Sequence, residues 1–201
     1  MSIEKAPRPD AGGPASPVGE ADPARLVGVA IVFYGLLFAA ALLWAWLEGR
    51  PLALRSPGLE VPWLRDGSLG LATAAALVAV SRALTAATSV GRALADALAR
   101  VLGRPGLGVC LALAAISGIA EEAFFRGALQ PRVGLVFASA LFAAAHFAPR
   151  REFLPWPFFA FAAGLAFGAL FDATGNLVAP VVAHAGVNAV NLYWLATRRR
   201  F

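Results

Sequence analysis

The chain has little charge and almost no cysteine, and each shortage excludes a class of protein. Only 14% of its 201 residues are Asp, Glu, Lys or Arg, whereas soluble domains carry about 25%. The single cysteine, Cys110, excludes an internal disulfide and therefore a disulfide-stabilised fold. Because 59% of the residues are hydrophobic, we expect an integral membrane protein that forms one compact bundle.

Histidine is equally scarce, since the chain holds two, His146 and His184. The His-Glu-x-x-His motif of zinc peptidases is missing. The net charge of +5 does not point to nucleic acid, because the basic residues lie at the ends of apolar segments, as the positive-inside rule describes. We therefore expect a lipid bilayer, and no nucleic acid, around this chain.

The apolar segments predict an all-α, polytopic transmembrane helix bundle of about six spans. Residues 1–25, rich in Pro, Gly and charge, are expected to form a disordered leader. After the second span, apolar residues from Leu84 to Val101 recur at helical spacing, which predicts that this helix continues out of the membrane as an amphipathic extension. The expected spans are Leu26–Leu47, 68–81, Leu107–Leu129, Val133–Phe147, Pro155–Phe171 and Leu177–Ala196.

An even number of spans puts both termini on the same side of the membrane. With these spans, 11 of the 17 Lys and Arg residues fall on the side of the termini. Since short cytoplasmic segments carry an excess of basic residues, the termini are predicted to be cytoplasmic.

The charged stretch near the end of the third span stands out, because ionisable residues within a membrane usually mark a function. Glu122 and Arg126 are four residues apart, so on a helix they can form an ion pair and support the structure. Glu121 points about 100° away from Glu122 and has no partner in the local pattern. Glu121 is therefore the candidate general base.

Three further polar residues lie in the later apolar segments. Phe142 precedes His146 by one helical turn and can pack against its ring, while His184 and Asn188 share a helix face. Such side chains can bind water, a carbonyl oxygen or a metal, or form plain hydrogen bonds between helices. Asn191, one turn further along, is assigned the plain structural role.

Together these groups suit amide hydrolysis. Glu121, helped by His146, would deprotonate a water that attacks a peptide carbonyl, and His184 with Asn188 would stabilise the oxyanion. Glu121, His146 and His184 are also a conceivable Zn²⁺ ligand set with water in the open position. The sequence favours the version without a cofactor and leaves the zinc version open.

In these motifs the sequence resembles the CAAX protease and bacteriocin-processing family of intramembrane proteases, also called Abi. Three family motifs occur in order: Glu-Glu-x-x-x-Arg at 121–126, Phe-x-x-x-His at 142–146 and His-x-x-x-Asn at 184–188. The resemblance covers about residues 107–192. The small size and the arginine-rich end also resemble the myxosortase-like or exosortase-like processing branch.

The resemblance implies a helical membrane endopeptidase, of a family described first as metal-dependent and later as glutamate-dependent. It implies Glu121 as base with His146 assisting, His184 and Asn188 on the oxyanion side, and Glu122 and Arg126 as supporting residues. It also implies a bacterial inner membrane and, as partner, the tail of a membrane-anchored protein. Residues 107–201 would then be the catalytic part, and residues 26–106 a set of membrane helices without a family motif.

Two other functions fit a bundle of this kind. One is a non-catalytic immunity or scaffold protein that keeps the fold. The other is a small transporter with Glu121 and the histidines as a proton relay, although the sequence lacks the inverted repeat that many transporters show. The intact motifs favour the peptidase.

Overall fold

The computed structural model describes residues 23–53 and 58–198. It confirms the predicted all-α membrane bundle. Of the predicted leader, residues 1–22 lie outside the described residues, and the chain from Pro23 onward already belongs to α1. The helices are α1 (Pro23–Leu47), α2 (Trp63–Ala87), α3 (Ser89–Leu102), α4 (Leu107–Glu122), a π-helical segment (Ala123–Leu129), α5 (Gln130–Ala145), a short 3₁₀ turn (Arg151–Phe153), α6 (Trp156–Thr174) and α7 (Val178–Thr197).

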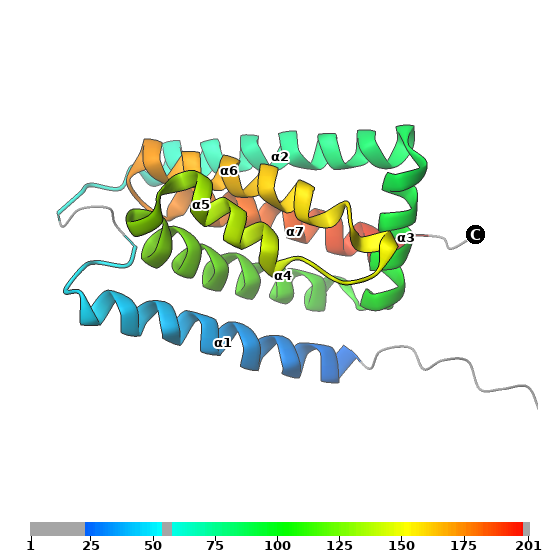
Figure 1. The fold of residues 1–201 in the computed structure, drawn as a ribbon, viewed down its shortest axis with the longest axis horizontal. Coiled ribbons are helices and arrows are strands. Elements are labelled where there is room, and N and C mark those ends of the chain that lie inside the picture. The colour runs from blue at the N-terminus through cyan, green and yellow to red at the C-terminus, as the bar shows by residue number, and fades with distance from the viewer. Residues whose placement is uncertain (1–22, 54–57, 199–201) are drawn as a thin grey trace, which may run out of the picture.

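The long helices run back and forth along one axis, and α3 lies across one end of the bundle (Figure 1). α7 occupies the interior, where it packs against α2, α4 and α6. α1 stands at the edge and contacts α4 and the π-helical segment. The described chain begins and finishes at the end where α3 lies, as an even number of passes requires (Figure 1).

Four stretches of the described residues are long and apolar enough to cross a membrane. They are Val27–Leu47, Trp63–Ala87, Leu107–Ala145 and Arg151–Thr174. The third covers 39 residues, more than one crossing of a hydrocarbon core about 30 Å thick needs. It contains two helices, α4 and α5, which run in opposite directions (Figure 1).

The reversal between α4 and α5 lies at Gly134, where the helical backbone is interrupted by a kink. Gly134 has φ 79° and ψ 166°, a backbone conformation that residues with a side chain rarely adopt. The sequence predicted that the third span ends near Pro131. Instead, the helix passes through the π-helical segment and Pro131 before it turns at Gly134.

One expectation about the second span is wrong. The amphipathic stretch does not continue α2, because the helix ends at Ala87 and Thr88 is extended, with φ −124° and ψ 145°. The Thr88 hydroxyl accepts a hydrogen bond from the Gly91 backbone N–H and so caps a new helix, α3. The cap turns the chain across the end of the bundle (Figure 1).

Small residues bring α2 and α7 together, as expected where packing rather than water holds helices in a membrane. A side chain at Gly70 would meet the Ala179 carbonyl oxygen at 2.6 Å, and one at Gly186 would meet the Ala74 side chain at 2.9 Å. This close approach holds α7, with its polar residues, in the middle of the bundle.

Candidate active site

The charged stretch lies where α4 passes into the π-helical segment. Glu121 is 6% exposed, and Glu122 and Arg126 are fully buried. Short π-helical segments are rare and often stand at functional sites. Helix geometry sends the two neighbouring carboxylates in different directions, so each meets its own histidine.

Glu122 is the centre of a cluster of charged groups, in which its own Oε2 and Arg126 Nε lack a hydrogen-bond partner. Its Oε1 accepts hydrogen bonds from Arg126 Nη1 at 3.0 Å and from His184 Nδ1 at 2.7 Å. The other end of the guanidinium, Nη2, donates to the Gly164 carbonyl oxygen of α6 at 2.9 Å. The predicted Glu122–Arg126 ion pair is therefore confirmed, and it joins α4, α6 and α7.

Glu121 faces the second histidine and is much less constrained. Its Oε2 is buried without a hydrogen-bond partner and lies 4.0 Å from His146 Nε2. His146 Nδ1 is 2.8 Å from the Phe142 carbonyl oxygen, which can only accept, so Nδ1 carries the proton. In the neutral ring, Nε2 is then an acceptor that faces a second acceptor across a gap too long for a direct hydrogen bond.

Aromatic rings fix both histidines. The predicted contact of Phe142 with His146 is present, with 4.6 Å between ring centroids, and Trp156 meets the same imidazole edge-on at 5.3 Å. Phe142 also contacts the His184 ring, which stacks on Phe167 at 5.0 Å. These contacts leave each imidazole little freedom to turn.

Asn188 and His184 occupy successive turns of α7 but have different partners. Asn188 Nδ2 donates to the Ser117 hydroxyl at 2.9 Å, while Ser117 donates to the Ala114 carbonyl oxygen in its own helix. His184 Nδ1 is engaged by Glu122, so the ring has an N–H to offer from Nε2 only when it carries both protons. The structure thus places His184 in the charged cluster as well as beside Asn188.

The sequence gave no role to Tyr34 of α1. The Tyr34 hydroxyl interacts with the Glu121 carboxylate, so a third helix reaches the candidate base. Tyr34 has the one side-chain hydroxyl of α1, and this polar group in an apolar span was the sequence signal that could have marked it as a candidate. The partner was not predictable, because nothing local links α1 to α4.

The alternative zinc site has no ready donor set. Among the described residues, no group of three or more His, Cys, Asp and Glu side chains is arranged to hold a metal ion. Glu121 pairs with His146, whereas His184 directs Nδ1 to Glu122. The described residues therefore form two carboxylate–histidine pairs and not a three-ligand set.

Comparison with known proteins finds a family that is similar to the stretch that carries these residues. Residues 104–190 match the family described as type II CAAX prenyl endopeptidase, Rce1-like. The matched stretch, less than half of the chain, is similar to this family. The resemblance to the CAAX protease family is thereby confirmed, and the matched stretch spans every candidate residue from Glu121 to Asn188. With its candidate membrane spans, the chain is an integral membrane protein.

A curated relative is similar over part of this chain. The uncharacterized protein YpbD of Bacillus subtilis is 40% identical over 80 residues, which are 39% of this chain and 41% of that protein. The chain therefore matches about two fifths of the length of this relative. No solved structure matches the chain.

Proposed function

We propose that this protein is an intramembrane endopeptidase that cleaves the tails of membrane-associated proteins with a water molecule activated by Glu121 and His146. The similarity to the Rce1-like family supports the class of activity. The observation that carries the mechanism is the pair of acceptors, buried Glu121 Oε2 and half-buried His146 Nε2, which lie 4.0 Å apart. A single water can donate one proton to each acceptor across such a gap.

In the proposed reaction, Glu121 takes a proton from this water as the new C–O bond forms at the peptide carbonyl. His146 accepts from the other O–H and holds the attacking oxygen in place, while the Phe142 carbonyl fixes its tautomer. The C–N bond then breaks as the proton held by Glu121 passes to the leaving amine. The products are a new carboxyl terminus and a new amino terminus, so the atoms of one water are accounted for.

In the proposed reaction, side chains of α7 donate hydrogen bonds to the oxyanion. Asn188 uses one amide N–H on Ser117 and has a second to offer, and doubly protonated His184 donates from Nε2 while Glu122 balances its charge. With both histidine and arginine charged, Glu121, Glu122, Arg126 and His184 sum to zero charge. Such a neutral group is far less costly in a membrane than a net charge.

The site in a membrane bundle suits a processing enzyme of the bacterial inner membrane. The basic residues at the segment ends suit cytoplasmic termini. Its partner would be a membrane-anchored protein whose tail enters the bundle. The zinc-dependent version and the myxosortase-like branch receive no support from the donor geometry or from the comparisons.

Terminal-peptide mass spectrometry on host membranes tests this function. Wild type is compared with a Glu121→Ala strain and an exposed-residue control, Glu60→Gln, at matched expression. The proposal predicts that a set of membrane proteins keeps its tails only in the Glu121→Ala strain. If no terminus differs although the variant inserts and folds, a non-catalytic scaffold or immunity protein replaces the peptidase.

A further inference from the structure

A large apolar cavity adjoins the candidate active site. Its volume is about 640 Å³, within the range of small-molecule sites, and α2, α3, α6 and α7 form its walls. Asn188 belongs to the wall, and so does Trp156, which packs on His146. Whatever fills this cavity therefore lies against Asn188 and against the indole that packs on His146.

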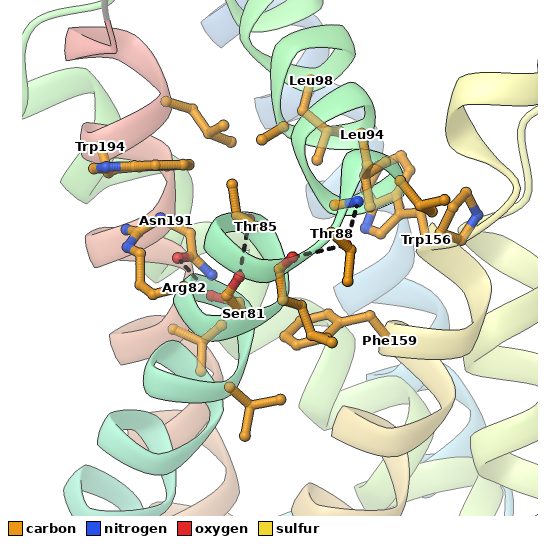
Figure 2. Close-up of a pocket in the computed structure, with 18 of the residues that line it drawn as sticks. Ser81, Arg82, Thr85, Thr88, Leu94, Leu98, Trp156, Phe159, Asn191 and Trp194 are labelled. Atoms are coloured by element: carbon orange, nitrogen blue, oxygen red, sulfur yellow. Dashed lines mark hydrogen bonds between the residues drawn. The ribbon is translucent and has the colours of Figure 1, made fainter.

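Much of the wall lies beyond the residues that are similar to the Rce1-like family. The family match covers residues 104–190, whereas the cavity is also lined by residues 80–98 of α2 and α3 and by 191–195 of α7. The bend at Thr88 carries α3 over the end of the bundle and brings Leu94 and Leu98 to the cavity (Figure 2). This part of the wall therefore lies outside the matched stretch.

The wall offers few polar partners. The hydroxyls of Ser81, Thr85 and Thr88 donate to carbonyl oxygens of their own helix, at 2.9, 2.9 and 2.7 Å. A peptide backbone that continued through this space would leave N–H and C=O groups unpaired, which is costly away from water. A short apolar segment that ends here limits that cost to its few residues.

Arg82 is the one ionised residue among those that line the cavity. Its guanidinium lies 3.7 Å from the centroid of Trp194 and donates to the Val190 carbonyl oxygen at a long 3.4 Å. Figure 2 shows Arg82, Asn191 and Trp194 on one side of the pocket and Trp156 and Phe159 on the other.

No ion pair among the described residues includes Arg82. The neighbouring charge that acts on it is another cation, Arg198, which stacks on the same Trp194 ring and is itself paired with Asp96. Arg82 therefore stands at the cavity as a positive charge whose fork of donors suits a carboxylate.

We propose that this cavity binds the apolar carboxyl-terminal end of the peptide substrate, with its terminal carboxylate on Arg82. Arg82 packs on Trp194, six residues beyond Asn188 on α7, which is about 9 Å along a helix. A few residues of extended peptide span that length. The inference rests on the proposed function for the identity of the occupant, and it makes Arg82 a specificity-determining residue.

Binding without turnover tests the site directly. The full chain with Glu121→Ala is placed in phosphatidylcholine nanodiscs and titrated with a dansylated decapeptide of leucine, valine and alanine, as free acid and as carboxamide. Empty nanodiscs correct for partition into lipid. Because a hydrogen-bonded charge is lost with the amide, the acid should bind about tenfold more tightly or better.

Adding Arg82→Gln should remove this preference, whereas adding Arg92→Gln should keep it. Arg92 is an exposed arginine of α3 that does not line the cavity, so it is the matched control. Arg82→Lys, which keeps the charge, should retain part of the preference. If Arg82→Gln does not fold, the acid and amide comparison on protein with intact Arg82 decides alone.

Three results would overturn the inference: equal affinity for acid and amide, a preference that survives Arg82→Gln, or no binding beyond empty nanodiscs. A preference that disappears in phosphatidylglycerol nanodiscs would also overturn it, because a lipid headgroup would then be the anion on Arg82. The proposed function fails separately. Acid-dependent binding without any changed terminus in membranes would remove the peptidase and leave the Arg82 site.

Discussion

Glu121 and Glu122 are neighbours in sequence, both are buried, and both face a histidine, yet their surroundings differ. The Glu122 carboxylate accepts from Arg126 and His184 at 3.0 and 2.7 Å, and the cluster reaches the α6 backbone through Arg126. Oε2 of each carboxylate lacks a hydrogen-bond partner, but the Glu121 carboxylate lies 4.0 Å from its histidine, whereas the Glu122 carboxylate lies 2.7 Å from its own. One carboxylate–histidine pair is in direct contact and the other is separated by a gap.

The difference shows how two neighbouring glutamates, each facing a histidine, can have different roles. Buried charges in direct contact hold helices together, and removing one partner is costly because the other stays buried. An unsatisfied buried carboxylate beside an acceptor nitrogen is unfavourable unless a donor enters. We therefore assign structure to the Glu122 pair and chemistry to the Glu121 pair.

The largest expected effect comes from Glu121→Gln, which keeps the size of the side chain and removes the base. Because general-base catalysis contributes up to about 10⁴-fold, cleavage should fall by about that factor. Thermal unfolding should stay where it is in the wild type. Cleavage per folded molecule is the measurement, with Glu60→Gln as control, and a fall of less than tenfold would assign the base elsewhere.

Glu122→Ala should act mainly on stability. It leaves Arg126 buried without its carboxylate and frees His184 from its partner, and breaking a buried pair in this way costs about 3–5 kcal/mol. Denaturant unfolding in detergent measures the change in unfolding free energy. A Glu122→Ala protein as stable as the wild type would contradict the structural role of this pair.

His146→Phe removes the ring nitrogens and keeps an aromatic ring against Phe142 and Trp156. Since His146 assists and Glu121 remains, we expect a loss of about 10²-fold in cleavage, at the lower end for acid–base residues. Folding should be retained. If His146→Phe cleaves at the wild-type rate, the water is not held between Glu121 and His146.

The smallest effect is expected at an exposed ion pair between α3 and the end of α7. Arg198 Nε lies 2.9 Å from Asp96 Oδ1, with much of the aspartate side chain open to solvent. Asp96→Asn should change the unfolding free energy by less than about 1 kcal/mol. A cost as large as that of Glu122→Ala would mean that burial does not distinguish the two ion pairs.

The sequence could predict what depends on neighbours along a helix. The Glu122–Arg126 pair and the contact of Phe142 with His146 follow from a spacing of four residues. The break at Thr88 was also open to prediction, because a threonine three residues before Gly91 is a capping signal that the apolar periodicity concealed.

Contacts between distant helices were out of reach. Nothing local shows that His184 directs Nδ1 to Glu122, that Asn188 meets Ser117, or that Tyr34 reaches Glu121. These contacts depend on the reversal at Gly134 and on the close packing of α7. The motifs therefore identified the participants, and the fold determined which carboxylate received which histidine.

The most direct test of the central claim uses a tail peptide identified in host membranes and the purified chain in nanodiscs, in water enriched in heavy oxygen. Mass spectrometry of the new carboxyl terminus follows its formation by wild type and by Glu121→Gln at equal amounts of folded protein. The account predicts one heavy oxygen in the wild-type product and almost no product from the variant. Product formed by Glu121→Gln at the wild-type rate would contradict the assignment of Glu121 as the base.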